Sequence, residues 1–179
     1  TVIQFKGEGQ IIKRHPEYGL NHRCLLEHVD FDKGTVEVDG KTYPMLDMKF
    51  PTIDPKDPLK LTEQEAELLQ TLKMSFRHSG LLHKHIKFLY SHGSMYKCCN
   101  NNLLYHGCIP LKKDGSFDDI VFYGIPYSGK ALMDFVDQMV QSAYFLPESN
   151  PDKGVASDFM WYLWCGAKSP LFGKEKMTT

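Results

Sequence analysis

The sequence predicts a mixed α+β fold on two observations. Apolar residues recur every three or four positions around 62–92 and 128–145, a spacing typical of amphipathic helices. Short runs of β-branched and aromatic residues lie between turn-forming Gly, Asn and Asp, which indicates antiparallel strands. The 179 residues are 42% hydrophobic and 24% charged, with a net charge of −1. This composition excludes a disordered tail, a collagen-like repeat and a charge-dominated nucleic-acid arm.

The first third of the chain predicts a small sheet and a connecting segment. Apolar positions within residues 1–13 suggest a helix, but two glycines weigh against it. Two turn sequences rich in Asp and Gly separate strand-like runs and predict an antiparallel hairpin or meander over 24–46. Four prolines from Pro44 to Pro58 then predict a connection that crosses the surface.

Two consecutive helices are predicted over 62–78 and 79–92. Thr62 and Glu65 form a capping-box pattern, in which each side chain can satisfy a free backbone N–H of the first turn. Gly93 ends the second helix. The first helix presents one apolar stripe that we expect to be buried, formed by Leu68, Leu69, Leu72 and Phe76.

The remaining elements are three strands followed by two helices. They are predicted as strands near 95–99, 103–106 and 120–125 and as helices near 128–145 and 155–165. Three asparagines, 100–102, separate the first two strands, and asparagine tolerates the left-handed backbone of a tight turn. Ser128 is expected to cap the helix that follows it.

The segment Gly124–Ala131, Gly-Ile-Pro-Tyr-Ser-Gly-Lys-Ala, allows two interpretations. A P-loop also joins a strand to a helix, and it cradles phosphates with its backbone N–H groups. Here Ala131 lacks the hydroxyl that would bind magnesium, and Pro126 removes one N–H. We therefore favour a strand–turn–helix connection capped by Ser128.

Histidines supply the candidate metal ligands. Four lie on the two predicted helices: His78, His83, His85 and His92. None is spaced by four from another, as in a helical zinc pair, so we expect them on the basic surface or partly buried. His106 is followed by glycine at the end of a predicted buried strand, a position that would hold its imidazole rigidly enough to bind a metal ion. Without further information, a histidine that is simply hydrogen-bonded at a strand end is the simpler explanation. Cys108 follows it, but no Asn or Asp partner completes a catalytic Cys–His arrangement.

Cysteine usage and hydropathy indicate a soluble protein of a reducing compartment. Five cysteines, an odd number that includes adjacent Cys98 and Cys99, give neither a disulfide framework nor a CxxC zinc pattern. No apolar run of about 18 residues occurs, and the N-terminus lacks a secretory signal. We expect a cytoplasmic protein with no membrane partner.

Charge is unevenly distributed. The block over residues 68–113 contains no acidic residue and carries seven cations: Lys73, Arg77, Lys84, Lys87, Lys97, Lys112 and Lys113. Such a block favours an anionic partner, either phosphate or nucleic acid. A solvated surface neutralised by the acidic segment that follows explains it equally well.

Ordered motifs along the whole chain suggest a family. They include Asp39-Gly40-Lys41-Thr42-Tyr43-Pro44, Leu103-Leu104-Tyr105-His106-Gly107-Cys108-Ile109-Pro110 and Met160-Trp161-Tyr162-Leu163-Trp164-Cys165-Gly166. Further matching segments are 4–5, 8–16, 50–58, 93–96, 129–134, 169–174 and 176–179. With these motifs the chain resembles the Firmicute-type (class III) fructose-1,6-bisphosphatases, which belong to the calcineurin-like metallophosphoesterases.

The resemblance implies a fold and an activity. The fold is expected to be part of a metallophosphoesterase αββα sandwich, a single piece over 1–179, with a helical insertion over 47–92 and later sandwich elements over 93–179. The implied reaction is hydrolysis of the 1-phosphate of fructose 1,6-bisphosphate in gluconeogenesis. It uses a two-metal site served by Mn²⁺ or Mg²⁺, which needs several ligands to clamp the phosphate.

The resemblance also implies site residues. Of the superfamily's ligand motifs only the His-Gly strand end is present, so His106 is the implied metal ligand. We expect the chain to be an internal fragment that is inactive by itself. Candidate contacts to the sugar bisphosphate are Lys174, Lys176, Arg14 and His15, although a solvated lysine tail is the slightly favoured explanation of the first two. No nucleic acid is expected and a homo-oligomer is allowed; the alternative function is a non-catalytic phosphate- or RNA-binding module that uses the basic 68–113 block.

Overall fold

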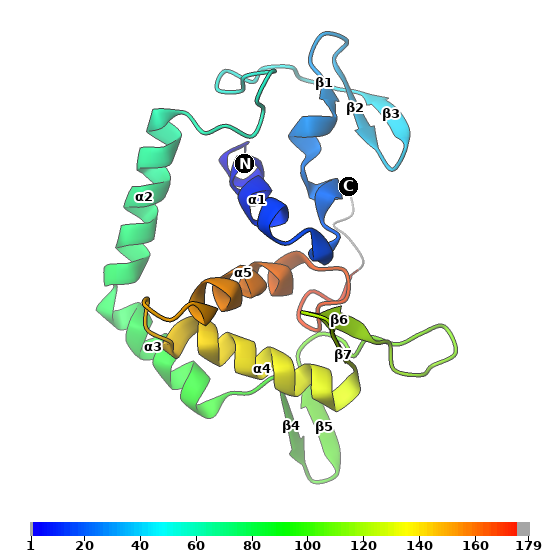
Figure 1. The fold of residues 1–179 in the computed structure, drawn as a ribbon, viewed down its shortest axis with the longest axis vertical. Coiled ribbons are helices and arrows are strands. Elements are labelled where there is room, and N and C mark those ends of the chain that lie inside the picture. Colours follow the sequence, from blue (N-terminus) through cyan, green and yellow to red (C-terminus); the bar gives the residue numbers. More distant parts are fainter. Residues whose placement is uncertain (1, 175–179) are drawn as a thin grey trace. The chain divides into compact units, whose positions relative to one another are not determined.

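The computed structural model describes residues 2–174 and divides the chain into two compact units, Thr1–Leu82 and His83–Thr179. Helices and small antiparallel sheets make up both units (Figure 1), which confirms the predicted α+β class. The predicted helical insertion over 47–92 and the assignment of 93–179 to a sandwich stay predictions about a larger domain.

The first unit combines helices with a three-stranded meander. Its elements are α1 (Val2–Arg14), three short 3₁₀ helices (Pro16–Tyr18, Asn21–Arg23 and Leu25–His28), β1 (Val29–Asp30), β2 (Thr35–Val38), β3 (Lys41–Pro44) and α2 (Glu63–His78). The strands pair antiparallel in the order β1-β2-β3, with Val36 opposite Tyr43. The predicted meander is therefore confirmed, but it begins at Val29, because the chain before it forms 3₁₀ turns instead of a strand.

Helix α1 forms despite the glycines that weigh against it. A Cβ on Gly9 would lie 2.6 Å from Leu59 Cδ1, so the missing side chain lets Leu59 pack directly on the helix backbone. Two buried ion pairs also anchor α1. Lys6 Nζ donates to Glu65 Oε2 at 2.8 Å, and Arg23 donates to both carboxylate oxygens of Glu8 at 2.6 and 2.9 Å. Tertiary contacts thus outweigh the low helix propensity of glycine.

The capping box of α2 is confirmed and also ties α2 to α1. Glu65 N–H donates to Thr62 Oγ1 at 3.2 Å, and Thr62 N–H donates to Glu65 Oε2 at 2.9 Å. Burial would raise the pKa of Glu65, but hydrogen bonds from Lys6 and from the Thr62 backbone outweigh it and lower the pKa from 4.5 to about 2. The carboxylate that caps α2 is therefore the one that neutralises Lys6.

This lowered pKa predicts an acid-dependent loss of stability. Because the folded-state pKa of Glu65 lies below its unfolded value, the carboxylate stabilises the fold fully above about pH 5, and this stabilisation is lost as the pH falls toward 2. We expect the difference in free energy of unfolding between the wild type and Glu65→Gln to shrink across that interval in urea titrations. Glu67→Gln, on the same helix, is the control. A difference that stays constant down to pH 2 would contradict the assignment.

The second unit contains two hairpins and a helical pair. Its elements are α3 (Gly80–His92, which begins in the first unit), β4 (Tyr96–Cys99), β5 (Asn102–Tyr105), β6 (Ile120–Phe122), β7 (Ile125–Tyr127), α4 (Gly129–Phe145) and α5 (Asp152–Cys165). Helices α4 and α5 pack side by side (Figure 1). The predicted helices and the β4–β5 hairpin are confirmed, and α5 begins three residues earlier than predicted.

An aromatic cluster forms the core of the second unit. Phe122 lies edge-on to Phe159 and Tyr162, with ring centroids 5.1 and 5.0 Å apart, and Phe135 stacks on Phe122 at 5.5 Å. Such pairs contribute about 0.5–1.5 kcal/mol each beyond their buried area. Burial raises the pKa of the Tyr162 hydroxyl to about 12. Phe159 and Tyr162 of α5 are thus core residues that hold α5 against α4, whereas Trp164 of the same helix is exposed.

Two predictions about the segment before α4 are wrong. Residues 120–125 are not one strand but the start of the β6–β7 hairpin, which turns at Tyr123 (φ 52°) and Gly124 (φ 80°). Because tyrosine seldom adopts a positive φ, a turn at this position was not predicted. Ser128 occupies the N-cap of α4, but its hydroxyl makes no capping hydrogen bond. Strand β7 leads through Ser128 into α4, so the favoured strand-to-helix connection is present, but it follows a hairpin and lacks the capping hydrogen bond.

The apolar stripe predicted to be buried on α2 is largely exposed. Leu68 and Leu72 are 48% and 47% exposed, and Phe76 is 65% exposed. Periodicity identifies the apolar face of a helix, but it does not identify what covers that face. The prediction of the helix was right and the prediction of its burial was wrong.

The structure bears on two expectations from the sequence, that no segment spans a membrane and that the cysteines form no disulfide framework. Every helix within 2–174 is too short or too polar to traverse a lipid bilayer. The five cysteines form no disulfide, and Cys24 and Cys165 are buried.

Candidate functional site around His106

His106 directly follows β5, but not in the predicted setting. All four residues of β5 are exposed, and Tyr105 is 46% exposed. The prediction of a buried strand is wrong because β4 and β5 form a sheet of only two strands, which leaves both faces open. His106 itself is exposed.

The backbone after His106 is held by the segment 169–173 instead of by a sheet. Cys108 N–H donates to the Pro170 carbonyl at 2.9 Å, and its thiol donates to the Ser169 carbonyl at 3.6 Å. Ser169 is fully buried, and its hydroxyl donates to the Leu163 carbonyl at 2.7 Å. The same hydroxyl accepts from two following backbone N–H groups at 3.2 Å. His106 is therefore fixed to the end of α5 through Ser169.

Gly107 makes this docking possible. A Cβ at position 107 would collide with the Pro170 carbonyl oxygen and lie 3.0 Å from that of Leu171. Backbone atoms cannot move aside as a flexible side chain can, so only glycine permits the approach. The glycine of the His-Gly pair thus has a packing role that its sequence position does not reveal.

We expect Gly107→Ala to weaken this docking. The variant should lower the free energy of unfolding by about 1–3 kcal/mol, because overpacking displaces the 169–173 backbone. Gly154→Ala is the matched control, because Gly154 lies within α5 and a Cβ at this position would have no atom within 4 Å. The control should be neutral or stabilising by about 0.5–1 kcal/mol. Equal effects of the two variants in thermal or urea denaturation would contradict this role of Gly107.

His106 lines two pockets of the second unit. One, of about 550 Å³, is mainly apolar and is lined also by Met160, Leu163, Trp164, Leu171 and Phe172. The other, of about 360 Å³, lies among the end of α3, the start of β4 and the end of β5. The imidazole therefore has open space beside it in which a ligand can sit.

The described residues do not form a two-metal site. No group of three or more His, Cys, Asp or Glu side chains within 2–174 is arranged to hold a metal ion. The four histidines of the helical region are exposed, and three of them, His78, His83 and His92, make other contacts; for example, His83 Nδ1 lies 3.0 Å from the Tyr144 hydroxyl. Burial raises the pKa of Cys108, which disfavours the thiolate that a Cys–His nucleophile would need.

The other predicted contacts divide between the units. In the first, Arg14 is exposed at the end of α1, whereas His15 is buried, with Nδ1 2.8 Å from Glu17 Oε1 and its ring stacked on Tyr18. These contacts give His15 a structural role. In the second, exposed Lys174 follows the 169–173 segment that docks beside His106. Lys176 lies outside the described residues, and the phosphate-binding roles of all four stay predictions.

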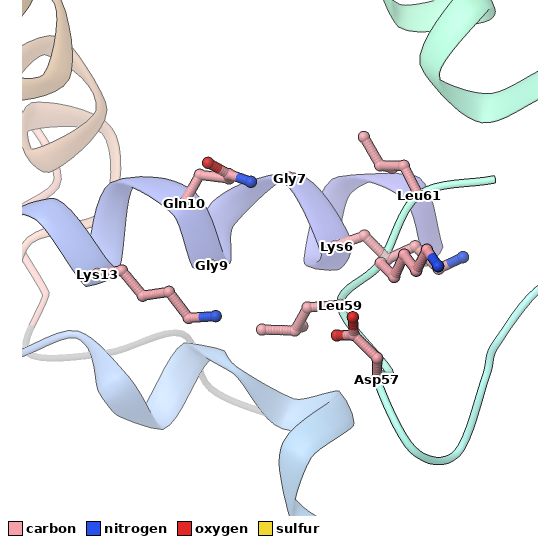
Figure 2. A pocket seen from close by; sticks show the side chains of 9 residues that line it. Lys6, Gly7, Gly9, Gln10, Lys13, Asp57, Leu59 and Leu61 are labelled. Carbon is pink, nitrogen blue, oxygen red and sulfur yellow. The ribbon is translucent and has the colours of Figure 1, made fainter. Parts of the chain in front are cut away.

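A further pocket lies in the first unit. It measures about 310 Å³, and Figure 2 shows Lys13, Asp57 and Leu59 facing one another across it beside α1. Arg14 and His15 do not line this pocket, although they follow Lys13 directly. Because its lining mixes lysines with a carboxylate, it shows no clear preference for an anion.

Sequence reasoning missed two polar residues of the 360 Å³ pocket. His92 and Lys97 line it together with His106. His92 had been assigned to a helical set and Lys97 to the basic block, because the sequence separates them from His106 by a whole hairpin. One sequence feature could have placed Lys97 near His106, namely the predicted hairpin over 95–106. Its pairing puts Tyr96 opposite Tyr105 and so brings position 97 close to position 106.

Comparison with known proteins gives the family. The sequence model described as Firmicute fructose-1,6-bisphosphatase matches residues 1–179. The chain is 51% identical to the class 3 fructose-1,6-bisphosphatase of Clostridium novyi and 52% identical to that of Clostridium tetani. A class 3 fructose-1,6-bisphosphatase of Bacteroides fragilis is 48% identical. Each comparison covers all of this chain and 27% of the relative's length.

No solved structure matches the chain significantly. The family match and the three relatives extend over every segment that carries the resemblance, including the His106-Gly107 strand end and the segment that docks against it. The chain therefore belongs to the Firmicute fructose-1,6-bisphosphatase family.

Proposed function

We propose that this chain is part of an enzyme that hydrolyses the 1-phosphate of fructose 1,6-bisphosphate to give fructose 6-phosphate in gluconeogenesis. The observation that supports this most is the placement of His106, whose imidazole is exposed beside two pockets while its backbone is fixed through Gly107, Cys108 and Ser169. A rigidly mounted imidazole at an open pocket suits a metal ligand. The names of the relatives agree with this activity.

We further propose that His106 is one ligand of a Mn²⁺ or Mg²⁺ pair of the metallophosphoesterase kind. One imidazole cannot hold two metal ions, so the proposal requires ligands beyond those of the described residues. It follows that the 179-residue chain should release no phosphate from the bisphosphate by itself. The chain spans 27% of the length of its curated relatives. The activity of the chain alone can therefore be compared with that of a full-length enzyme.

The test compares a full-length enzyme that contains this chain with the chain alone. Phosphate release is measured with fructose 1,6-bisphosphate, fructose 6-phosphate and glucose 6-phosphate, with each metal in turn. The full-length enzyme should act on the bisphosphate and stop after one phosphate per molecule. Absence of bisphosphate hydrolysis with either metal would refute the activity, and metal-dependent hydrolysis by the chain alone would refute the requirement for further ligands.

We also propose a cytoplasmic location, which the odd cysteine count and the metabolic substrate support. The competing function is phosphate or RNA binding by the 68–113 block. One observation favours it: all seven cations of the block are exposed. Binding of RNA that weakens steeply with salt would support that module, whereas the phosphatase does not require it.

A further inference from the structure

The 360 Å³ pocket beside His106 carries an unbalanced positive charge. None of its lining residues is acidic, and Lys97 makes no ion pair within residues 2–174. Two carboxylates hydrogen-bond to this pocket's wall, and neither is paired with Lys97. Asp134 accepts from the Tyr96 hydroxyl at 3.0 Å and is paired with Lys130 at 2.5 Å, and Asp137 accepts from the Met95 backbone N–H. The Lys97 ammonium therefore remains available to an anion.

His92 adds a hydrogen-bond acceptor of defined orientation. Its Nδ1 lies 3.1 Å from the Phe88 carbonyl oxygen and 2.9 Å from Ser91 Oγ, and its ring stacks on Phe88 at 4.4 Å. Because a carbonyl oxygen can only accept, the hydrogen of the neutral ring belongs on Nδ1. The lone pair is then on Nε2, where it can accept a hydrogen bond from a ligand hydroxyl.

The pocket has the size and lining of a small-molecule site. Its volume lies at the lower end of the range of about 300–1,000 Å³ typical of such sites. Leu104 and Leu171 contribute apolar wall, and Tyr105 and His106 lie at the end of β5. A ligand in this pocket therefore lies next to His106.

Resting on the proposed function, we propose that this pocket binds the phosphate of the sugar bisphosphate that is not hydrolysed, together with a neighbouring hydroxyl. Lys97 pairs with that phosphate and His92 Nε2 accepts from the hydroxyl. The reacting phosphate then lies on the side of His106. Two phosphates at opposite ends of one sugar are thus recognised by different parts of the second unit.

The role of Lys97 is tested by comparing the KM values of the full-length enzyme for two substrates. Lys97→Met should raise KM for fructose 1,6-bisphosphate about 10-fold or more with a smaller change in kcat, since a charge-assisted contact is lost. It should leave KM for p-nitrophenyl phosphate, which has no second phosphate, unchanged. Lys41→Met, on exposed strand β3, is the matched control and should change neither. An unchanged KM for the bisphosphate in Lys97→Met would overturn the assignment.

The test of His92 is rescue by a conservative variant. His92→Phe should raise KM for the bisphosphate several-fold, whereas His92→Gln, whose amide oxygen can replace Nε2 as an acceptor, should recover most of the loss. Equal KM values for the wild type and His92→Phe, or no recovery with glutamine, would overturn the role of His92.

Failure of the proposed function can be distinguished from failure of this inference. If the unaltered full-length enzyme does not hydrolyse the bisphosphate, the proposed function fails. The pocket is then tested by binding of inorganic phosphate to the same protein. Weaker phosphate binding in Lys97→Met than in Lys41→Met supports the anion site, and equal binding overturns it.

Discussion

Replacing His106 by alanine is expected to lower turnover of fructose 1,6-bisphosphate in the full-length enzyme by at least about 100-fold. Loss of groups that merely support a metal ligand already costs about 10–100-fold, so loss of a ligand should cost more. The bound metal should fall below two ions per enzyme. Because His106 is exposed at the end of an open hairpin, the variant should keep its fold.

Metal content by elemental analysis and turnover at saturating substrate check this prediction together. His22→Ala is the control, since His22 is an exposed histidine on a 3₁₀ turn of the first unit. Full metal stoichiometry and full turnover in His106→Ala would rule out His106 as a ligand. Unchanged metal content with reduced turnover would assign it to substrate contact instead.

Replacing Arg23 by methionine is expected to destabilise the first unit strongly. Arg23 and Glu8 form a two-point ion pair in which each side chain is 6% exposed, so the variant leaves the Glu8 carboxylate buried without this partner. Breaking a buried pair from one side typically costs about 3–5 kcal/mol. The free energy of unfolding from urea titrations should fall by that amount.

A double variant separates the cost of the unpaired charge from the value of the pair. Replacing both partners, Glu8→Leu with Arg23→Met, should recover most of the lost stability, since no charge is then left buried. Asp30→Ala, which breaks the exposed pair with Lys33, is the control and should have a much smaller effect. If Arg23→Met were no more destabilising than Asp30→Ala, the buried pair would have no special role.

Local sequence signals predicted most of the helices and turns. The Thr62–Glu65 capping box is formed as expected, and Asn100 and Asn101 adopt the positive φ angles that a tight hairpin turn needs. Predictions failed where the deciding contact lies far along the chain. Helix α1, for example, depends on Leu59 reaching Gly9. The turn at Tyr123 is a local exception, missed because tyrosine seldom adopts a positive φ.

The candidate site divides in the same way. The sequence identified His106 as the ligand that the family resemblance implies, and it identified the basic character of the region around Lys97. It did not identify what fixes His106, because Gly107 and Pro170 meet only after α5 and the 169–173 segment have folded back. It also separated His92 and Lys97 from His106, although the three line one pocket.

By itself, the sequence determined the α+β class, the ends of several helices, the family and one candidate ligand, since capping, turn chemistry and motif order act over a few neighbouring residues. Only the tertiary structure decided which apolar faces are covered, which charges are paired in the interior and which polar side chains share a pocket with His106. The contacts that decide most of these outcomes join residues distant along the chain, such as Lys6 with Glu65 and Cys108 with Ser169, and local residue spacing does not reveal them.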